Sequence, residues 1–341
     1  MYEFYLSVDE QKGGGNKYAI KNCYEELSEA EFILLNKLIR HFKQGLLSLI
    51  EVKTLFVLHL LGFNIQRLNY KAMRNVFTEN IYRLTREISF FYRIVYEDEK
   101  KFSALSSALQ QQLKTMFPSD LPETPETRVA AKMKRHIVIY AEFGKNIIPS
   151  LKIGRTKYTG YTFNITDGLA TTSLTALQFA EAQKVVQQYA QTQSNELLNL
   201  LCSILYSPVA GLYSENHSAA YALQFKKVAN EVKESILLNF CAIINFIVHK
   251  TKYSILFLRP QGKKEEKKKT YSLGLVDNMY MLSKKGYGDS LQMENSNLFK
   301  FFDLLIKELK DNVQELERAG KTKPEIAEAL NLTITEINEL S

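Results

Sequence analysis

The sequence predicts a mainly α fold: a helical bundle with a small β element near residues 130–165 and a C-terminal hairpin of the helix-turn-helix type. The helix-start motif L-[ST]-x-x-[EQ]-F occurs twice, at Leu27–Phe32 and at Leu174–Phe179. In each copy a hydroxyl N-cap is followed three residues later by a side chain that can bond back to the cap. Apolar residues also recur at three- and four-residue spacing, and two further cap signals lie close together within residues 321–340.

Length and composition bound the class of protein. The chain has 341 residues, enough for one large domain or two ordinary ones, with 45% hydrophobic and 24% charged residues. The net charge is +7, and part of the excess lies in one short run with two glutamates that contains Lys263, Lys264, Lys267, Lys268 and Lys269. A run of this kind is usually a solvated loop. We retain these lysines as candidate partner-binding residues.

Cysteine usage and apolar runs indicate a reducing cytoplasm and no membrane span. Cys23, Cys202 and Cys241 are far apart and lack C-x-x-C spacing, so free thiols are favoured over disulfides or a metal site. The N-terminus lacks the basic region and apolar core of a signal peptide. The most apolar stretch, Ile236–Val248, is short for a membrane span and contains asparagines, which predicts a buried core helix.

Residues 1–115 are predicted to form an N-terminal helical domain. Residues 1–22 contain two short extended segments around a loop of three consecutive glycines, which is typical of a hairpin. Three helices are then expected, and their ranges are from Ser28 to near Phe42, from about Leu47 to Leu61, and over about residues 71–95. Gly62 provides a stop for the second of them.

Residues 116–165 are predicted to be a linker with short strands. Prolines at positions 118, 122 and 125 exclude a helix interior between Met116 and Thr127. Apolar and β-branched runs beyond them predict strands at Ile137–Tyr140, Leu151–Ile153 and Tyr161–Phe163.

Residues 166–318 are predicted to form a second helical domain. Helices are expected at Thr175 to about Thr192, Glu196–Tyr206, about Ala219–Ala229, Val232–Lys250 and about Ser296–Arg318, with Ser296 as the last N-cap. A short segment near residues 275–283 precedes the last helix. Residues 253–257 fit either a strand or the continuation of a helix.

Residues 319–341 are predicted to form a helix-turn-helix-like hairpin. Thr322 with Glu325 and Thr333 with Glu336 each form a potential capping box, and Asn331 lies at the turn, where asparagine tolerates the left-handed conformation. A second helix starting at Thr333 would be short and would expose Glu336 and Glu339, which phosphates repel. Packing or partner binding is therefore favoured. The alternative is DNA contact, with the candidate residues Thr333, Thr335 and Asn338.

Motifs that carry catalytic chemistry are not found in the sequence. The five histidines lack H-E-x-x-H or H-x-x-x-H spacing and none is paired locally with cysteine. The Gly13–Gly15 loop lacks the spacing of a phosphate-binding loop, and no G-x-S-x-G element occurs. We therefore expect no catalytic residue, no cofactor and no metal, and we predict that the chain is not an enzyme.

Several segments carry a resemblance to known proteins. They are Tyr18–Phe32, in which Tyr24 stands where the related proteins have Trp; Leu174–Ala182 with Tyr189; Leu197–Pro208 with Tyr213; and Gly286–Ser290 before a long helix. Over most of its length the chain resembles unassigned tail-module proteins, assembly chaperone-like or structural, that phages and prophages of Bacteroides-type bacteria encode.

This resemblance implies a function in tail assembly or virion structure through protein–protein contacts. The implied partner is a tail or tape-measure-type protein, or a second copy of the chain, with no membrane involved. The implied location is the host-cell cytoplasm or the virion. A DNA-binding regulator that uses residues 321–341 is the alternative function.

Overall fold

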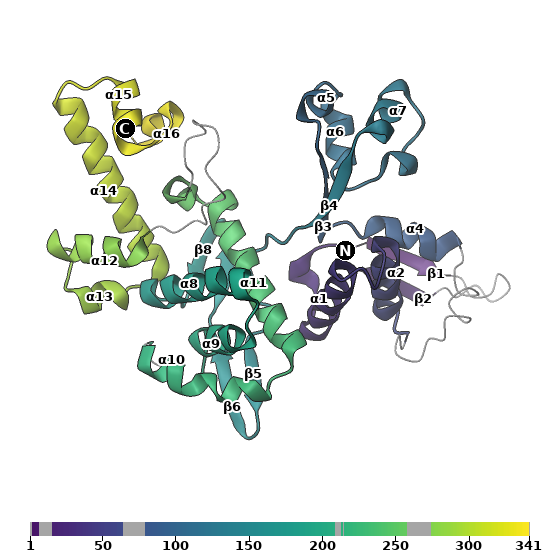
Figure 1. Cartoon of the computed structure of the whole chain (residues 1–341), viewed down its shortest axis with the longest axis horizontal. Coiled ribbons are helices and arrows are strands. Elements are labelled where there is room, and N and C mark those ends of the chain that lie inside the picture. Colours follow the sequence, from purple (N-terminus) through teal and green to yellow (C-terminus); the bar gives the residue numbers. More distant parts are fainter. Residues whose placement is uncertain are drawn as a thin grey trace. The chain divides into compact units, whose positions relative to one another are not determined.

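The computed structural model describes residues 2–6, 16–63, 79–208, 213, 215–257 and 274–340. It contains two compact units, Met1–Ala141 (the N-terminal unit) and Glu142–Ser341 (the C-terminal unit), and most described residues are helical (Figure 1). The expectation of a mainly α protein is confirmed. The division between the units falls inside the predicted linker 116–165, and residues 116–141 belong to the N-terminal unit.

The N-terminal unit begins with an antiparallel hairpin and capped helices. The hairpin joins β1 (Tyr2–Leu6) to β2 (Asn16–Ile20), and a short 3-10 turn, η1 (Tyr24–Glu26), precedes α1 (Glu29–Lys43). The backbone N–H of Glu31 donates to Ser28 Oγ (3.3 Å) and the N–H of Ser28 donates to Glu31 Oε2 (2.6 Å), which completes the predicted capping box. A second box starts α2 (Leu49–Leu60) at Ser48, and Gly62 follows the helix with a positive φ of 84°.

The helix predicted over about residues 71–95 is wrong in its C-terminal part. The helix α4 (Glu79–Glu87) ends early, and β3 (Tyr92–Tyr96) pairs antiparallel with β4 (Arg135–Ile139). Within β3 the side chains of Tyr92, Ile94 and Tyr96 are buried, which is the period of a strand. The aromatic and β-branched residues of this segment fit both the helical and the strand period. The local sequence also contains no sign of the partner strand, which lies about 40 residues later in the chain. Residues 71–78 of the predicted helix lie outside the described residues.

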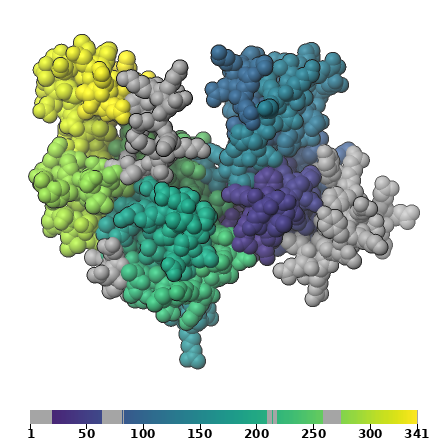
Figure 2. Space-filling model, viewed as in Figure 1, coloured from purple at the N-terminus to yellow at the C-terminus, as the bar shows by residue number. Residues whose placement is uncertain are grey.

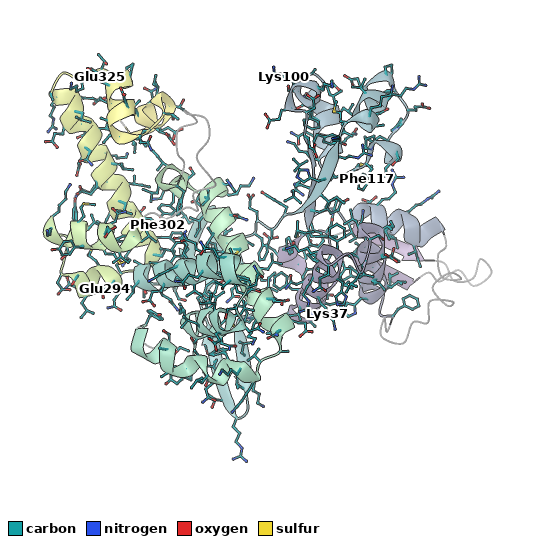
Figure 3. The ribbon with its side chains drawn as sticks, viewed as in Figure 1. Lys37, Lys100, Phe117, Glu294, Phe302 and Glu325 are labelled. Carbon is teal, nitrogen blue, oxygen red and sulfur yellow. The ribbon has the colours of Figure 1, made fainter. Side chains whose placement is uncertain are left out.

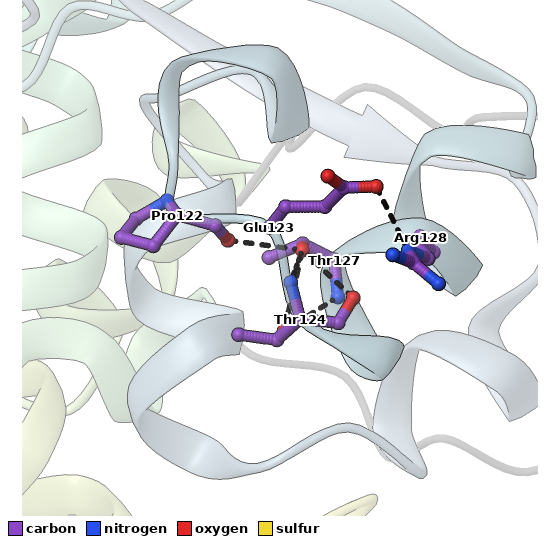
Figure 4. Close-up of polar contacts among 5 residues, drawn as sticks. All are labelled: Pro122, Glu123, Thr124, Thr127 and Arg128. Carbon is purple, nitrogen blue, oxygen red and sulfur yellow. Dashed lines mark hydrogen bonds and ion pairs between the residues drawn. The ribbon is translucent and has the colours of Figure 1, made fainter.

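The ribbon of β3 and β4 carries small helices at one end (Figure 1). They are α5 (Glu99–Ser103), α6 (Ser107–Leu113), η3 (Pro118–Asp120) and α7 (Pro125–Lys132). The start of α7 shows why prolines occur here, because Pro125 takes a first-turn position whose N–H needs no helical partner. Thr127 donates its hydroxyl to Pro122 O (3.1 Å), and its N–H donates to Thr124 Oγ1 (3.1 Å; Figure 4).

Short strands lie at the beginning of the C-terminal unit. β5 (Ser150–Ile153) and β6 (Thr156–Gly160) form a projecting hairpin that β9 (Tyr206–Ser207) extends, while β7 (Phe163–Thr166) pairs with β8 (Leu169–Thr172) (Figure 1). The strand predicted at residues 151–153 is confirmed within one residue, and the one predicted at residues 137–140 is confirmed but begins two residues earlier and ends one residue earlier. The strand predicted at Tyr161–Phe163 is wrong in its bounds, because Tyr161 and Thr162 lie between β6 and β7, where the chain changes sheets.

Long helices form the body of the C-terminal unit. They are α8 (Ala176–Thr192), α9 (Asn195–Leu205), α10 (Glu215–Ala222), η4 (Gln224–Lys227), α11 (Asn230–Lys250) and η5 (Lys252–Leu256). Residues 253–257 were left open between strand and helix, and residues 253–256 belong to this 3-10 helix, which Phe257 follows. The helix predicted at about Ala219–Ala229 is instead α10 followed by η4.

The second copy of the helix-start motif behaves differently from the first. Thr175 caps α8 by accepting from the N–H of Gln178 (3.1 Å). The Gln178 side chain does not return to the cap, because its amide donates to Ile204 O (2.6 Å) at the end of α9. The prediction that it bonds back to the cap is therefore wrong, and tertiary contact with α9 is the reason.

Aromatic packing joins these helices to α14 (Leu298–Arg318). Phe302 of α14 is fully buried and packs its ring against Phe179, Tyr253 and Phe257 (Figure 3). The N-cap of α14 is Asn297, whose Oδ1 accepts from the N–H of Phe299 (3.1 Å), and not the predicted Ser296. The Ser296 hydroxyl donates to Met293 O (2.7 Å) instead.

The C-terminal end of α14 is covered by two short helices, α15 (Lys323–Leu330) and α16 (Ile334–Leu340) (Figures 1 and 2). Between them Asn331 adopts the predicted left-handed conformation (φ 57°). Ile326, Leu332, Ile337 and Leu340 are buried in one cluster with Val313 of α14. This cluster attaches residues 323–340 to the rest of the C-terminal unit.

Candidate functional site

The predicted partner-binding lysines lie outside the described residues. Lys263, Lys264, Lys267, Lys268 and Lys269 all fall within residues 258–273. Of the remaining predicted site residues, Thr335 and Asn338 are on α16 and Thr333 directly precedes it.

The candidate nucleic-acid contacts Thr333, Thr335 and Asn338 are brought together at α16, but two of them make structural hydrogen bonds. Thr333 accepts from the N–H of Glu336 (3.2 Å), and its own N–H donates to Glu336 Oε2 (2.6 Å). Asn338 accepts from Lys323 Nζ (2.5 Å). Glu336 is buried, so the expectation that it is exposed is wrong: its carboxylate is held inward by the cap of α16.

The outward face of α16 suits protein better than nucleic acid. Residues 321–340 contain two lysines and four glutamates, a net charge of −2, and α16 itself contains no cation. Ile334 is 50% exposed beside the exposed Thr335 and Glu339. A DNA-reading helix needs cations to hold the phosphates, and this face presents a carboxylate and an apolar side chain.

Three large apolar side chains are exposed on α12 (Leu275–Lys284) and α13 (Ser290–Glu294). These helices bury Leu275, Met279 and Leu282 on their inner side. On the outer side Val276 (61%), Tyr280 (59%) and Leu291 (65%) are exposed. We call these three residues the α12–α13 apolar face. Val276 and Tyr280 are four residues apart on one helix, so they are neighbours on its surface.

An ion pair with one buried partner, Glu308, links the end of α12 to α14. Glu308 of α14 is largely buried and accepts from Lys285 Nζ at the end of α12. Burial raises the pKa of the Glu308 carboxyl, but hydrogen bonds from Lys285 and Tyr287 more than offset this and hold the pKa below its usual value. This ion pair therefore fixes the end of α12, the helix that carries Val276 and Tyr280, to α14.

The buried polar groups of the C-terminal unit serve packing. Lys233 of α11 is buried and donates to Asn199 Oδ1 (2.8 Å) on α9. Asn239 of α11 bonds the backbone at Lys145 and Ile147. Cys202 is fully buried, and burial raises the pKa of its thiol to about 12, so it stays protonated and is no nucleophile.

The expectation of free thiols agrees with the structure, because Cys23, Cys202 and Cys241 are all free. No group of three or more His, Cys, Asp or Glu side chains that could hold a metal ion occurs among the described residues. In the described part of the chain, α11 is the one helix long and apolar enough to cross a membrane, and 50% of its most apolar window is buried inside the structure.

The N-terminal unit contains a pocket that the sequence did not reveal. It has a volume of about 250 Å³, and its lining includes Lys53 of α2, Arg86 of α4, Tyr92 of β3, residues 115–117 and Asp120. Lys53 is only 8% exposed, and burial lowers the pKa of its amine to about 8. Its Nζ lies 3.4 Å from Tyr92 Oη, which in turn donates to Thr115 O (2.7 Å).

Sequence reasoning missed this pocket because its residues come from separate elements. Lys53 lies within an apolar helix, between Val52 and Thr54, and one lysine among apolar neighbours is the only local signal. An open groove at the α5–α7 end is larger, at about 700 Å³, but its lysines are interspersed with Glu97, Asp98 and Glu99. Lys101 pairs with Asp98 (2.8 Å), so that groove has little uncompensated charge.

No protein-family model, no curated protein and no solved structure matches this chain.

Proposed function

We propose that the chain is a non-enzymatic phage or prophage protein that acts through protein–protein contacts in tail assembly or virion structure. The observation that carries the proposal is the α12–α13 apolar face, in which Val276, Tyr280 and Leu291 are each about three-fifths exposed. Grouped exposed apolar side chains mark interaction sites, because an apolar partner removes them from water. The resemblance to tail-module proteins supplies the biological setting.

The chemistry of the face fits an amphipathic helix of a tail or tape-measure-type protein. Such a helix presents apolar side chains at three- and four-residue spacing, and these can lie along Val276 and Tyr280. Lys284 Nζ lies 4.4 Å from the centre of the Tyr280 ring, so the edge of the face also offers a cation to an acidic partner residue. Aromatic side chains of this kind contribute strongly to binding.

The proposal is tested by co-purification from cells that produce the phage. The tagged full-length chain is expected to retain a tail protein, identified by mass spectrometry, and the double variant Val276→Asp/Tyr280→Asp is expected to lose it. Leu46→Asp is the matched control, because Leu46 is 67% exposed and belongs to the N-terminal unit. Equal retention by the wild-type chain and the double variant contradicts the proposal.

A second candidate is a DNA-binding regulator in which α15 and α16 act as a helix-turn-helix. Two capped helices joined by a tight turn at Asn331 favour it. The carboxylates and the lack of cations on α16 oppose it, because phosphate contacts supply most of the non-specific affinity for DNA. A gel-shift assay between low and high salt decides: salt-dependent binding that disappears on deletion of residues 321–341 supports the regulator and contradicts the preferred function.

A further inference from the structure

We propose that the pocket beside Lys53 in the N-terminal unit binds a small organic monocarboxylate with a short apolar body, whose charged end lies against Lys53 and Arg86. This site is separate from the protein-contact function proposed above. The argument rests on the pocket, on the cations that line it and on its apolar walls. Phe117, part of the pocket wall, is labelled in Figure 3.

The two cations that line the pocket, Lys53 and Arg86, make hydrogen bonds to neutral groups. Lys53 makes a long hydrogen bond to the hydroxyl of Tyr92, and that hydroxyl is oriented by donating to the Thr115 carbonyl. A neutral hydroxyl does not compensate a buried ammonium. Arg86 donates through Nη2 to the backbone carbonyl of Asp120 (2.6 Å), which also leaves the guanidinium charge without a carboxylate in that bond.

The charged groups that influence Lys53 are Asp120, Arg86 and Glu87. Of these, Arg86 and Asp120 line the pocket, so its walls carry two cations with Lys53 and one carboxylate. The Asp120 carboxylate raises the pKa of Lys53 and so offsets part of the effect of burial, and its Oδ2 also accepts from the N–H of Phe117 (3.3 Å). A bound carboxylate restores charge balance at Lys53 and Arg86, and Arg offers it a bidentate geometry.

The rest of the pocket determines the body of the ligand. Leu49, Ile50, Met116 and Phe117 supply apolar walls. The volume of about 250 Å³ lies just below the range that drug-sized ligands occupy, so the ligand is small. A doubly charged phosphate is disfavoured because Asp120 lines the same pocket and the apolar walls cannot replace its hydration. A short aliphatic or aromatic monocarboxylate fits the pocket, because its carboxylate can pair with Lys53 and Arg86 and its apolar body can contact the apolar walls.

The test uses hexanoate and benzoate as probes and the full chain as receptor, with binding followed by isothermal titration calorimetry and ligand-detected NMR. We expect both carboxylates to bind, hexanamide to bind at least tenfold more weakly, and hexylamine not to bind. We expect Lys53→Met and Arg86→Gln each to weaken hexanoate binding at least tenfold. Lys37→Met, on α1 and away from the pocket, is the matched control and is expected to bind as the wild type does.

The pH dependence of hexanoate affinity is a second test, and its result does not depend on whether a variant folds. Deprotonation of Lys53 removes the positive charge, so hexanoate affinity is expected to fall as the pH rises through about 8. Arg86 remains charged over this range. Equal affinity for hexanoate and hexanamide, or unchanged affinity in a folded Lys53→Met variant, overturns the proposal. No binding of either carboxylate also overturns it, whereas co-purification of tail proteins is unaffected by any of these outcomes.

Discussion

Lys53 has a proposed role in ligand binding, and its burial lowers the stability of the folded protein. The residue is 8% exposed, and its ammonium has a tyrosine hydroxyl as its hydrogen-bond partner. Desolvation therefore penalises the charged form and lowers its pKa from 10.5 to about 8. A group held in this way costs the folded state free energy at neutral pH, and such groups occur at binding sites.

Replacing Lys53 with methionine is therefore expected to stabilise the N-terminal unit at pH 7. The difference in pKa corresponds to roughly 3 kcal/mol at most, and loss of the contact to Tyr92 reduces it, so we expect a gain of about 1–2 kcal/mol. Between pH 8 and 10 Lys53 is still protonated in the unfolded chain but largely deprotonated in the folded chain, so the unfolded chain binds more protons. The unfolding free energy of the wild type therefore rises over this window, and its difference from that of Lys53→Met becomes smaller.

Urea unfolding of both proteins at pH 7, 8, 9 and 10 measures this gap. Comparison with the variant removes the effect of the tyrosines, among them Tyr92, whose pKa burial raises to about 12. A gap that stays constant from pH 7 to 10, or a variant that is clearly less stable at pH 7, contradicts the description of Lys53 as a desolvated ammonium.

Asn239 shows the opposite case, a buried polar residue that stabilises. It is 1% exposed; its Oδ1 accepts from the N–H of Ile147 (2.8 Å) and its Nδ2 donates to Lys145 O (2.8 Å). Asn239→Leu is expected to cost about 2–4 kcal/mol of unfolding free energy, because both hydrogen bonds are lost inside the protein. The control Asn164→Leu changes an exposed asparagine of β7 and is expected to stay within about 0.5 kcal/mol by the same denaturant titration. Equal costs for the two variants contradict the structural role of Asn239.

At the scale of elements, local signals predicted the structure well where the partners of a residue lie within one turn of it. The starts of α1, α15 and α16 follow from Ser28, Thr322 and Thr333 with their glutamates, since a capping box needs only four consecutive residues. Gln178 fits the same motif, yet its side chain bonds Ile204, because α9 packs beside it. The strand β3 was missed for a similar reason, because the strand that pairs with it, β4, is distant in the sequence.

The pocket beside Lys53 could not be predicted, because α2, α4, β3 and the segment before η3 must come together to form it. The α12–α13 apolar face was also missed. The spacing of apolar residues predicts which side of a helix is buried. It does not predict that large apolar side chains are also exposed on the other side, as Val276 and Tyr280 are. Sequence reasoning therefore located most helices, while the candidate sites depend on tertiary structure.

The hairpin of α15 and α16 offers a matched test at the element scale. Ile337 is fully buried in the cluster with Val313, whereas Ile334 on the same helix is 50% exposed. Ile337→Ala is expected to weaken the attachment of the hairpin by about 2–5 kcal/mol, and Ile334→Ala is expected to change it little. Hydrogen exchange of amides in residues 323–340 measures the difference. Similar protection in the two variants contradicts the packing described for α16.

At the scale of the whole molecule, charge is unevenly distributed. The chain carries a net charge of +7, yet residues 321–340 carry −2. A chain that bound DNA through its C-terminal helices would be expected to concentrate cations there, and this one does the reverse. The exposed apolar side chains of α12 and α13, together with Ile334, lie in the C-terminal unit. Both features favour the proposed contact with a protein partner over DNA binding.

The central claim is that this protein assists tail assembly or forms part of the virion through the α12–α13 apolar face. The most direct measurement is the fraction of tailed particles, counted by electron microscopy, after deletion of the gene from the phage or prophage that carries it. We predict tailless or misassembled particles after deletion, rescue by the wild-type chain and by Leu46→Asp, and no rescue by Val276→Asp/Tyr280→Asp. Normal tails without the gene, or full rescue by the folded double variant, would contradict the account.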